Sequence, residues 1–190
     1  LMGRGEFYLL SSWAPGRPYA EDLRRMAGGG PGPLDLGRCD ALCDYLVRLH
    51  QRSRAGPAKY RRSVRDLVGH GEGVFGIIDA FPEDTPGAPA RRLELIEGAL
   101  HGWRWRLRGF EGRLARIHGD FHPFNLVFEE GKTAFTALDA ARGCQGDPAD
   151  DLTALAVNYV FFALERPASW RAALGVLWRR LWDRYLEASG

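Results

Sequence analysis

The stretch "HGDFHPFNLVF", His118 to Phe128, decides how this chain is interpreted. It places two histidines, a carboxylate and a carboxamide within eight residues, between apolar segments on both sides. A polar turn "EEGK" and the run "TAFTAL" follow, and this pattern predicts a β-hairpin. Antiparallel pairing brings Asn125, before the first strand, close to Asp139, after the second. With Asp120 in the same loop, the hairpin predicts a cluster of oxygen ligands beside a free carboxylate.

These side chains suit magnesium chemistry. Mg²⁺ prefers hard oxygen ligands, takes one or two of them from protein, and leaves its other positions to water and substrate phosphates. A neighbouring carboxylate that is not a ligand can orient a substrate hydroxyl and accept its proton. The kinase catalytic loop divides the work in this way, with the pattern His-x-Asp, four residues, then Asn. His118, Asp120 and Asn125 reproduce that spacing, and Asp139 supplies the further acid.

Together with the later stretch "ALDAARGCQGDPADDLTAL", residues 137–155, the motif resembles the aminoglycoside phosphotransferase and choline kinase-like superfamily. The fold of that superfamily is related to the protein kinases, and the resemblance covers roughly the whole chain as a C-terminal lobe. It implies ATP as phosphoryl donor, Mg²⁺ as cofactor and a small molecule with a hydroxyl group as acceptor. By position, it implies Asp120 as the catalytic base and Asn125 and Asp139 as magnesium ligands.

The resemblance also implies roles outside this cluster. The stretch "FYLLSSWAPGRP", residues 7–18, is similar to the hinge strand and linker that join the two lobes of such kinases. The hinge backbone expected to bind adenine lies at Ser12, Trp13 and Ala14. Three further residues are expected to support the site structurally: His118, His122 and Asp151.

The chain as a whole predicts an α+β, mainly helical fold: a protein-kinase-like C-terminal lobe with a small catalytic β-hairpin and its N-terminal lobe largely absent. Residues 1–16 are expected to be the hinge strand and linker from that missing lobe, and residues 17–190 the helical lobe. The first residue is Leu1, so the chain is expected to be part of something longer. Apolar spacing and cap signals predict six helices, at residues 21–26, 35–50 with Asp35 as N-cap, 60–68, 91–107, 151–164 and 170–186, and a short strand at 113–117.

Composition narrows the class of protein. A chain of 190 residues, 45% of them hydrophobic, can bury one sizeable core. Lys and Arg number 26 against 24 Asp and Glu, a balance that argues against a nucleic-acid partner. The longest apolar run, Leu152 to Leu164, is too short to span a bilayer, so a soluble cytoplasmic protein without a membrane partner is expected. Cys39 and Cys43 are expected to be buried thiols, and Cys144 a structural residue.

The lack of a suitably placed lysine keeps a non-catalytic, kinase-like binding module open as an alternative. A kinase needs a lysine on the phosphates, yet the only lysines, Lys59 and Lys132, lie in a polar link and in the hairpin turn. The stretch "GEGVFG", Gly71 to Gly76, fits G-x-G-x-x-G. No strand precedes it, however, so we interpret it as a flexible loop and not as a phosphate cradle.

Two other interpretations rank lower. A metallohydrolase is suggested by the H-x-D-x-H run of His118, Asp120 and His122, but the other histidines fall in or beside helices with no expected pairing. The stretch "WRWRLR", residues 103–108, interleaves basic and aromatic residues as single-stranded nucleic-acid sites do. An apolar stripe through Trp103 and Leu107 accounts for these positions, with the arginines on a solvated face.

Overall fold

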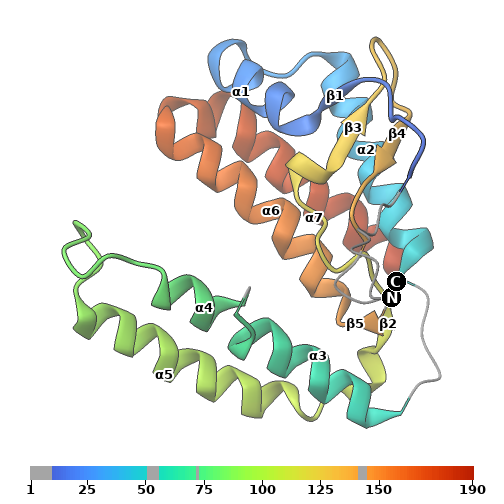
Figure 1. The fold of residues 1–190 in the computed structure, drawn as a ribbon. Coiled ribbons are helices and arrows are strands. Elements are labelled where there is room, and N and C mark those ends of the chain that lie inside the picture. Colours follow the sequence, from blue (N-terminus) through green and yellow to red (C-terminus); the bar gives the residue numbers. More distant parts are fainter. Residues whose placement is uncertain (1–9, 51–55, 72, 141–144) are drawn as a thin grey trace, which may run out of the picture.

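The computed structural model describes residues 10–50, 56–71, 73–140 and 145–190. Helices dominate, and the strands are short (Figure 1). The elements in chain order are β1 (Arg17–Pro18), α1 (Tyr19–Gly29), α2 (Pro33–Leu49), α3 (Pro57–Gly69), α4 (Val74–Asp79), α5 (Ala90–Leu107), η1 (Glu111–Arg113), β2 (Ala115–Arg116), η2 (Pro123–Asn125), β3 (Leu126–Phe128), β4 (Phe135–Ala137), β5 (Gln145–Gly146), α6 (Pro148–Glu165), η3 (Trp170–Leu174) and α7 (Gly175–Ser189).

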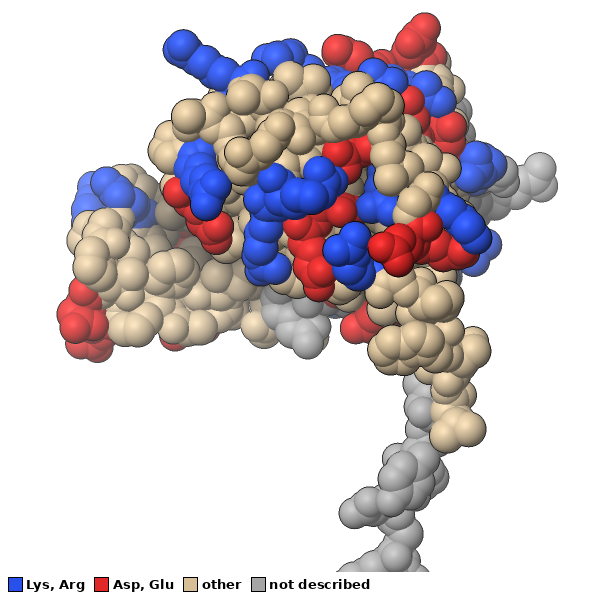
Figure 2. Space-filling view, turned by 90° about the horizontal axis from the view of Figure 1, so that it is seen from above, with Lys and Arg blue, Asp and Glu red and all other residues tan. Residues whose placement is uncertain are grey.

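The main core lies between α1, α2, α6, α7 and the β3–β4 hairpin. Its largest fully buried side chains include Tyr19, Leu42, Leu46, Phe121, Phe128, Tyr159 and Phe162. Cys39 and Cys43 are buried free thiols, as predicted, and each lies 3.7 Å from a carbonyl of α7. Figure 2 shows basic and acidic side chains interspersed on the face seen there, in keeping with the balanced charge. No helix in the described ranges is long and apolar enough to cross a membrane.

The predicted hairpin is confirmed. β3 and β4 pair antiparallel, with Val127 opposite Thr136 and Phe128 opposite Phe135, and β1 adds a third strand on the other side of β3. The expected strand before Pro15 is wrong for the part that is described, because residues 10–14 form no strand. Leu10 and Trp13 are 95% and 88% exposed, so neither packs on another part of the described chain. The prediction for residues 7–9 lies outside the described residues.

Gly16 controls how the chain enters the sheet. Its φ of 129° is in the region that favours glycine, and a Cβ atom there would lie 2.1 Å from the carbonyl oxygen of Phe128. The chain therefore meets β3 one residue later, where Arg17 pairs with Phe128.

Arg38 of α2 anchors the turn of the hairpin. Its Nε donates to the carbonyl of Lys132 at 2.9 Å, and its Nη2 donates to the carbonyl of Glu129 at 2.8 Å. The same guanidinium forms an ion pair with the buried Asp22 and lies 4.7 Å from the centre of the Phe128 ring. One buried cation thus ties α1, α2 and the hairpin together.

Several helix boundaries differ from prediction. α3 and α6 each begin three residues earlier than expected, and the helix expected at residues 170–186 is divided into η3 and α7. α1 runs three residues past Met26, into the glycine cluster, and begins two residues before Glu21. Asp35 was expected to cap α2, but Pro33 is the first helical residue and Gly32 is the N-cap. Asp35 lies one turn in, where its Oδ2 accepts from the Gly32 backbone N–H at 2.8 Å. The Asp35 carboxylate still satisfies a free backbone amide at the start of the helix, but it does so from the third helical position and not as the N-cap.

α3, α4 and α5 form an arm beside the main body (Figure 1). The loop expected over Gly71 to Gly76 is wrong, because α4 begins at Val74. A Cβ atom on Gly73 would lie 2.5 Å from the Leu67 carbonyl, and one on Gly76 would lie 1.8 Å from the Gly71 carbonyl. The glycine spacing therefore serves close backbone packing at the corner between α3 and α4, where a flexible loop was expected from the sequence.

Two apolar stripes are less buried than their patterns indicated. α5 was expected to pack on a stripe that includes Trp103, but none of its residues is buried, and Trp103 is 54% exposed. α6 was expected to be central because it is apolar nearly all round. It is buried on one side only, and the opposite side leaves four apolar residues exposed: Val157, Val160, Phe161 and Leu164. A wholly apolar sequence does not say how many faces the fold will cover.

Candidate active site

The loop with the motif lies between two short pieces of sheet. β2 leads into it and pairs with β5, so the chain enters beside the start of α6. The loop ends in the short helical turn η2, where the His122 Nδ1 accepts from the Phe124 backbone N–H at 3.2 Å. Pro123 takes the first position of this turn, where a missing N–H costs nothing. β3 follows directly, so the loop is held at both ends.

Asp120 and Asn125 lie together inside this loop. The Asn125 Nδ2 donates to the Asp120 Oδ2 at 3.1 Å and to the Asp120 backbone carbonyl at 3.1 Å. The Asn125 side chain therefore presents its nitrogen to Asp120 and keeps its oxygen for another partner. His122 Nε2 lies 3.5 Å from the Asp120 Oδ2, and the Asp120 side chain is 18% exposed. The carboxylate is positioned by its neighbours yet still accessible to a substrate.

Asp139 follows the second strand, as the hairpin predicted. The Leu138 backbone N–H donates to the Asn125 carbonyl at 2.8 Å, so the pairing continues to the residue just before Asp139. Asp139 has a φ of 53°, and no other residue except glycine has a positive φ in the described ranges. Its side chain is exposed. Such a conformation costs free energy for a residue with a Cβ. The sequence did not reveal this strain, which falls on a residue expected from the sequence to be a magnesium ligand.

Asp151 connects the loop to α6. This fully buried carboxylate accepts from the His118 backbone N–H at 2.7 Å and from the Gly119 backbone N–H at 2.8 Å. Hydrogen bonds of this kind, to an ionised acceptor, are among the stronger ones in proteins. Because Asp151 stands in the first turn of α6, it fixes the two residues that precede Asp120 relative to that helix.

His50 and Tyr185 extend this network, and sequence analysis missed both. The His50 Nε2 lies 3.0 Å from the Asp151 Oδ2, and its Nδ1 lies 2.8 Å from the Tyr185 hydroxyl. The expectation that His50 has no pairing is therefore wrong. Burial raises the pKa of Tyr185 to about 12. The available signal was weak: His50 follows Leu46 by one helical turn, and Tyr185 lies in the apolar stripe of the last helix.

The H-x-D-x-H run does not converge on a transition-metal site. His118 is buried, and its Nδ1 accepts from the Asp120 backbone N–H at 3.3 Å. Over the described ranges, His, Cys, Asp and Glu side chains form no group of three or more that could hold a metal ion. Magnesium sets a different requirement, since one or two protein oxygens suffice. The Asn125 side-chain oxygen and the exposed Asp139 carboxylate could supply such oxygens.

The residues expected at the hinge lie before β1. Ser12 and Trp13 are exposed and Ala14 is partly buried, all three without regular secondary structure. They precede the strand that pairs with β3, and β3 follows Asn125 directly. Residues 12–14 and the loop with the motif thus lead into neighbouring strands of the same small sheet.

Solved structures resemble this fold. The glucosamine kinase in one crystal form matches with a TM-score of 0.60 and 21% identity, over 90% of this chain and 47% of that one. The same enzyme in complex with glucosamine, ADP and inorganic phosphate matches with a TM-score of 0.59 and 20% identity, over 90% and 49%. The aminoglycoside phosphotransferase APH(3'')-Id from Streptomyces rimosus matches with a TM-score of 0.53 and 16% identity, over 92% and 63%. This chain spans about half the length of the glucosamine kinase.

At this level of identity the matches establish the kinase-like fold. No curated protein matches the sequence. The model of the phosphotransferase enzyme family matches residues 2–188, nearly the entire chain and every residue of the site described above. The chain belongs to the phosphotransferase enzyme family.

Proposed function

We propose that the protein carrying this chain is an ATP-dependent kinase that transfers the γ-phosphoryl group to a hydroxyl group of a small molecule. Residues 17–190 form its C-terminal, catalytic lobe in this proposal, and residues 1–16 its hinge strand and linker. The single observation that carries the proposal is the Asp120–Asn125 pair at 3.1 Å, at the end of a hairpin whose other end holds Asp139. A carboxylate, a carboxamide and a second carboxylate in this order are the working groups of a kinase catalytic loop.

Each residue has a distinct task in this reaction. Asp120 orients the acceptor hydroxyl and takes its proton as the new bond between the acceptor oxygen and the γ-phosphorus forms. The bond between that phosphorus and the β-phosphate oxygen breaks, and ADP leaves. Asn125 holds the Asp120 carboxylate in place through its Nδ2, while its oxygen and the Asp139 carboxylate would hold Mg²⁺. When bound, the ion neutralises charge on the transferring phosphates.

The supporting groups keep this arrangement rigid. Asp151 holds the backbone before Asp120, and His122 caps the turn before Asn125. We assign adenine binding to the backbone of Ser12, Trp13 and Ala14 because it leads into the sheet beside the catalytic loop. A cytoplasmic location is part of the proposal. The cytoplasm supplies ATP, and it is a reducing compartment in which free thiols such as Cys39 stay reduced.

The named relatives support a small-molecule acceptor, and we propose that it bears the hydroxyl group that is phosphorylated. One is a glucosamine kinase solved with glucosamine and ADP, and another was solved with ADP and streptomycin. Sugars, amino sugars and aminoglycosides are therefore the first acceptors to screen. The binding-module alternative has no observation in its favour beyond the missing lysine, and the residues of the catalytic loop argue against it.

The test is phosphoryl transfer by the protein that carries this chain, measured by ADP release with a panel of these acceptors. Replacing the base in Asp120→Asn should lower kcat by about 10²–10⁴-fold. Asp139→Ala should abolish the magnesium dependence together with most of the rate, and exposed Asp183→Asn on α7 should change neither. Full magnesium-dependent transfer by Asp139→Ala would mean that the site is wrongly assigned. If the native protein released no ADP with any acceptor, the result would favour the binding module.

A further inference from the structure

A positively charged pocket lies on the arm, between α3 and α5, apart from the candidate active site. It has a volume of about 300 Å³, and five arginines line it: Arg61, Arg62 and Arg65 from α3, and Arg104 and Arg108 from α5. The α3 arginines recur at helical spacing, so they share one face of that helix, and the two from α5 are four residues apart. None of the residues assigned to phosphoryl transfer lines this pocket.

The pocket carries more positive charge than its surroundings neutralise. Arg61 pairs with Glu111, its Nε lying 2.8 Å from that carboxylate, while Arg62 and Arg65 share Asp66 at 3.2 and 2.8 Å. These contacts hold the pKa of Asp66 below its usual value, chiefly through the hydrogen bond from Arg65. Five guanidinium groups thus face two carboxylates, which leaves an excess of three positive charges.

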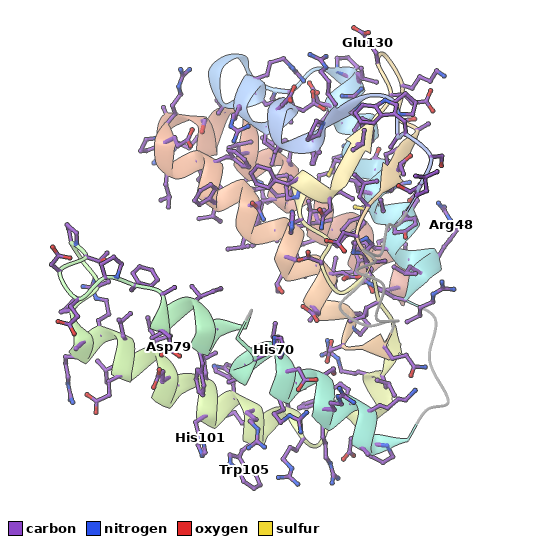
Figure 3. All side chains as sticks on the ribbon, in the orientation of Figure 1. Arg48, His70, Asp79, His101, Trp105 and Glu130 are labelled. Carbon is purple, nitrogen blue, oxygen red and sulfur yellow. The ribbon has the colours of Figure 1, made fainter. Side chains whose placement is uncertain are left out.

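The two arginines of α5 account for most of this excess. In the parts of the chain that the structure describes, no carboxylate forms an ion pair with Arg104 or Arg108. Both lie over the ring of Trp105 instead, with their Cζ atoms 5.8 and 4.4 Å from its centre. Figure 3 shows Trp105 on the side of α5 that points away from the main body. The ring fixes the two side chains without neutralising them, so their N–H groups stay available to an anion.

We propose that this pocket binds a phosphate-type oxyanion with two or more negative charges, either free or as the end of a larger small molecule. Arginine forks match the oxygens of phosphate in pairs, and five of them around one space would repel each other without a counter-charge. The volume lies at the lower end of the range for small-molecule sites, which suits a compact anion such as pyrophosphate. The inference rests on the arm alone and does not depend on the proposed kinase activity.

The pocket also adjoins the support of the catalytic loop. Tyr60, which lines the pocket, donates to the Asp147 Oδ2 at 2.7 Å, and Asp147 caps α6 through the Ala149 backbone N–H at 2.9 Å. Asp151 is in the first turn of that same helix. An anion in the pocket is therefore two hydrogen-bonded residues away from the helix start that holds the catalytic loop.

The test is calorimetric titration of inorganic pyrophosphate into the purified chain, without divalent cations and at constant ionic strength. We expect saturable binding of one anion per chain. Loss of two charged hydrogen-bond donors in Arg104→Ala/Arg108→Ala should weaken it by at least about tenfold. The matched control Arg91→Ala/Arg106→Ala removes the same charge from the same helix outside the pocket and should change the affinity less than about threefold. Circular dichroism would verify that both variants keep the native helix content.

Further variants show whether the pocket itself, net charge or another site causes the binding. Arg104→Lys/Arg108→Lys keeps the charge but loses the forks, and we expect it to weaken binding as well. Asp120→Asn should bind pyrophosphate as the native chain does, because the pocket is distinct from the catalytic loop. If both double-alanine variants bound pyrophosphate equally weakly, net charge alone would explain the effect, and the proposed site would be wrong. Binding of a single-stranded oligonucleotide without measurable binding of pyrophosphate would also overturn the proposal, and it would make this surface a nucleic-acid site.

Discussion

At the scale of single residues, Asp151 holds the loop with the motif to α6. It is fully buried and accepts hydrogen bonds from two backbone N–H groups and from His50. Asp151→Ala leaves these buried donors unsatisfied, so we expect it to lower the free energy of unfolding by about 3–5 kcal/mol. Asp151→Asn keeps one acceptor oxygen and should cost less. Urea denaturation measures both.

The control for this prediction is the exposed Asp183→Asn, which should stay within about 0.5 kcal/mol of the native chain. A loss below about 1 kcal/mol for Asp151→Ala would show that the loop does not depend on this carboxylate. The role of Asp151 was predicted from the sequence, whereas His50 and Tyr185 were not, because their contacts join residues 101 and 135 positions apart. Such distant pairs leave no local pattern.

A second residue-scale prediction concerns Arg38. Removing this side chain leaves Asp22 buried without its closest cation and frees two carbonyls of the hairpin turn. We expect Arg38→Ala to lower the free energy of unfolding by about 3–5 kcal/mol. Arg38→Met keeps a long stem for packing on Phe128 but not the charge, so it should be nearly as unfavourable. Equal stability of Arg38→Met and the native chain would show that shape, and not charge, holds the hairpin.

At the scale of elements, the arm offers a pair of glycines that should respond in opposite directions. Gly76→Ala forces a Cβ atom against the Gly71 backbone, so we expect a loss of about 1–3 kcal/mol. Gly98 lies inside α5 with open space where a Cβ would be, so Gly98→Ala should stabilise the chain by about 0.5–1 kcal/mol. Thermal unfolding of the two variants compares them directly. A stabilising Gly76→Ala would mean that the α3–α4 corner is looser than described.

The elements themselves were predictable wherever one period of apolar residues ran without interruption. The hairpin and the helices near residues 35–50, 60–68 and 91–107 follow from such runs. Burial did not follow, because α5 and α6 carry apolar residues on faces that none of the described elements covers. The helix at Val74–Asp79 was missed since glycines normally interrupt helices, and here they serve the contact between two of them. Periodicity reports local conformation, and close backbone approach is a tertiary property.

At the scale of the whole molecule, buried tyrosines limit how far the pH can rise before the folded chain loses stability. Burial raises the pKa of Tyr185 from 10.0 to about 12, and burial also raises the pKa of Tyr60. Below pH 10 both folded and unfolded chains keep these protons, so stability is fully present. Between pH 10 and 12 the unfolded chain loses the Tyr185 proton first, and stability should fall by up to about 1.4 kcal/mol per pH unit for this residue.

Urea denaturation at several pH values, followed with tyrosine absorbance at 295 nm, tests this expectation. Tyr185→Phe removes the ionisable group and should flatten the decline above pH 10 relative to the native chain. It also removes the hydroxyl near His50, so its stability at pH 7 should be lower by about 0.5–1.5 kcal/mol. An unchanged decline in Tyr185→Phe would assign the alkaline sensitivity to the other tyrosines.

One residue at the start of the sheet has a consequence for evolution. Gly16 holds a backbone conformation that L side chains avoid, and the oxygen of Phe128 occupies the place where a side chain would begin. Random mutation followed by selection for folded protein should therefore keep glycine at this position, while the exposed residues around it accept substitutions. A position of this kind records the meeting of two strands, and it would be retained for the sake of the fold, whatever the activity of the descendant protein.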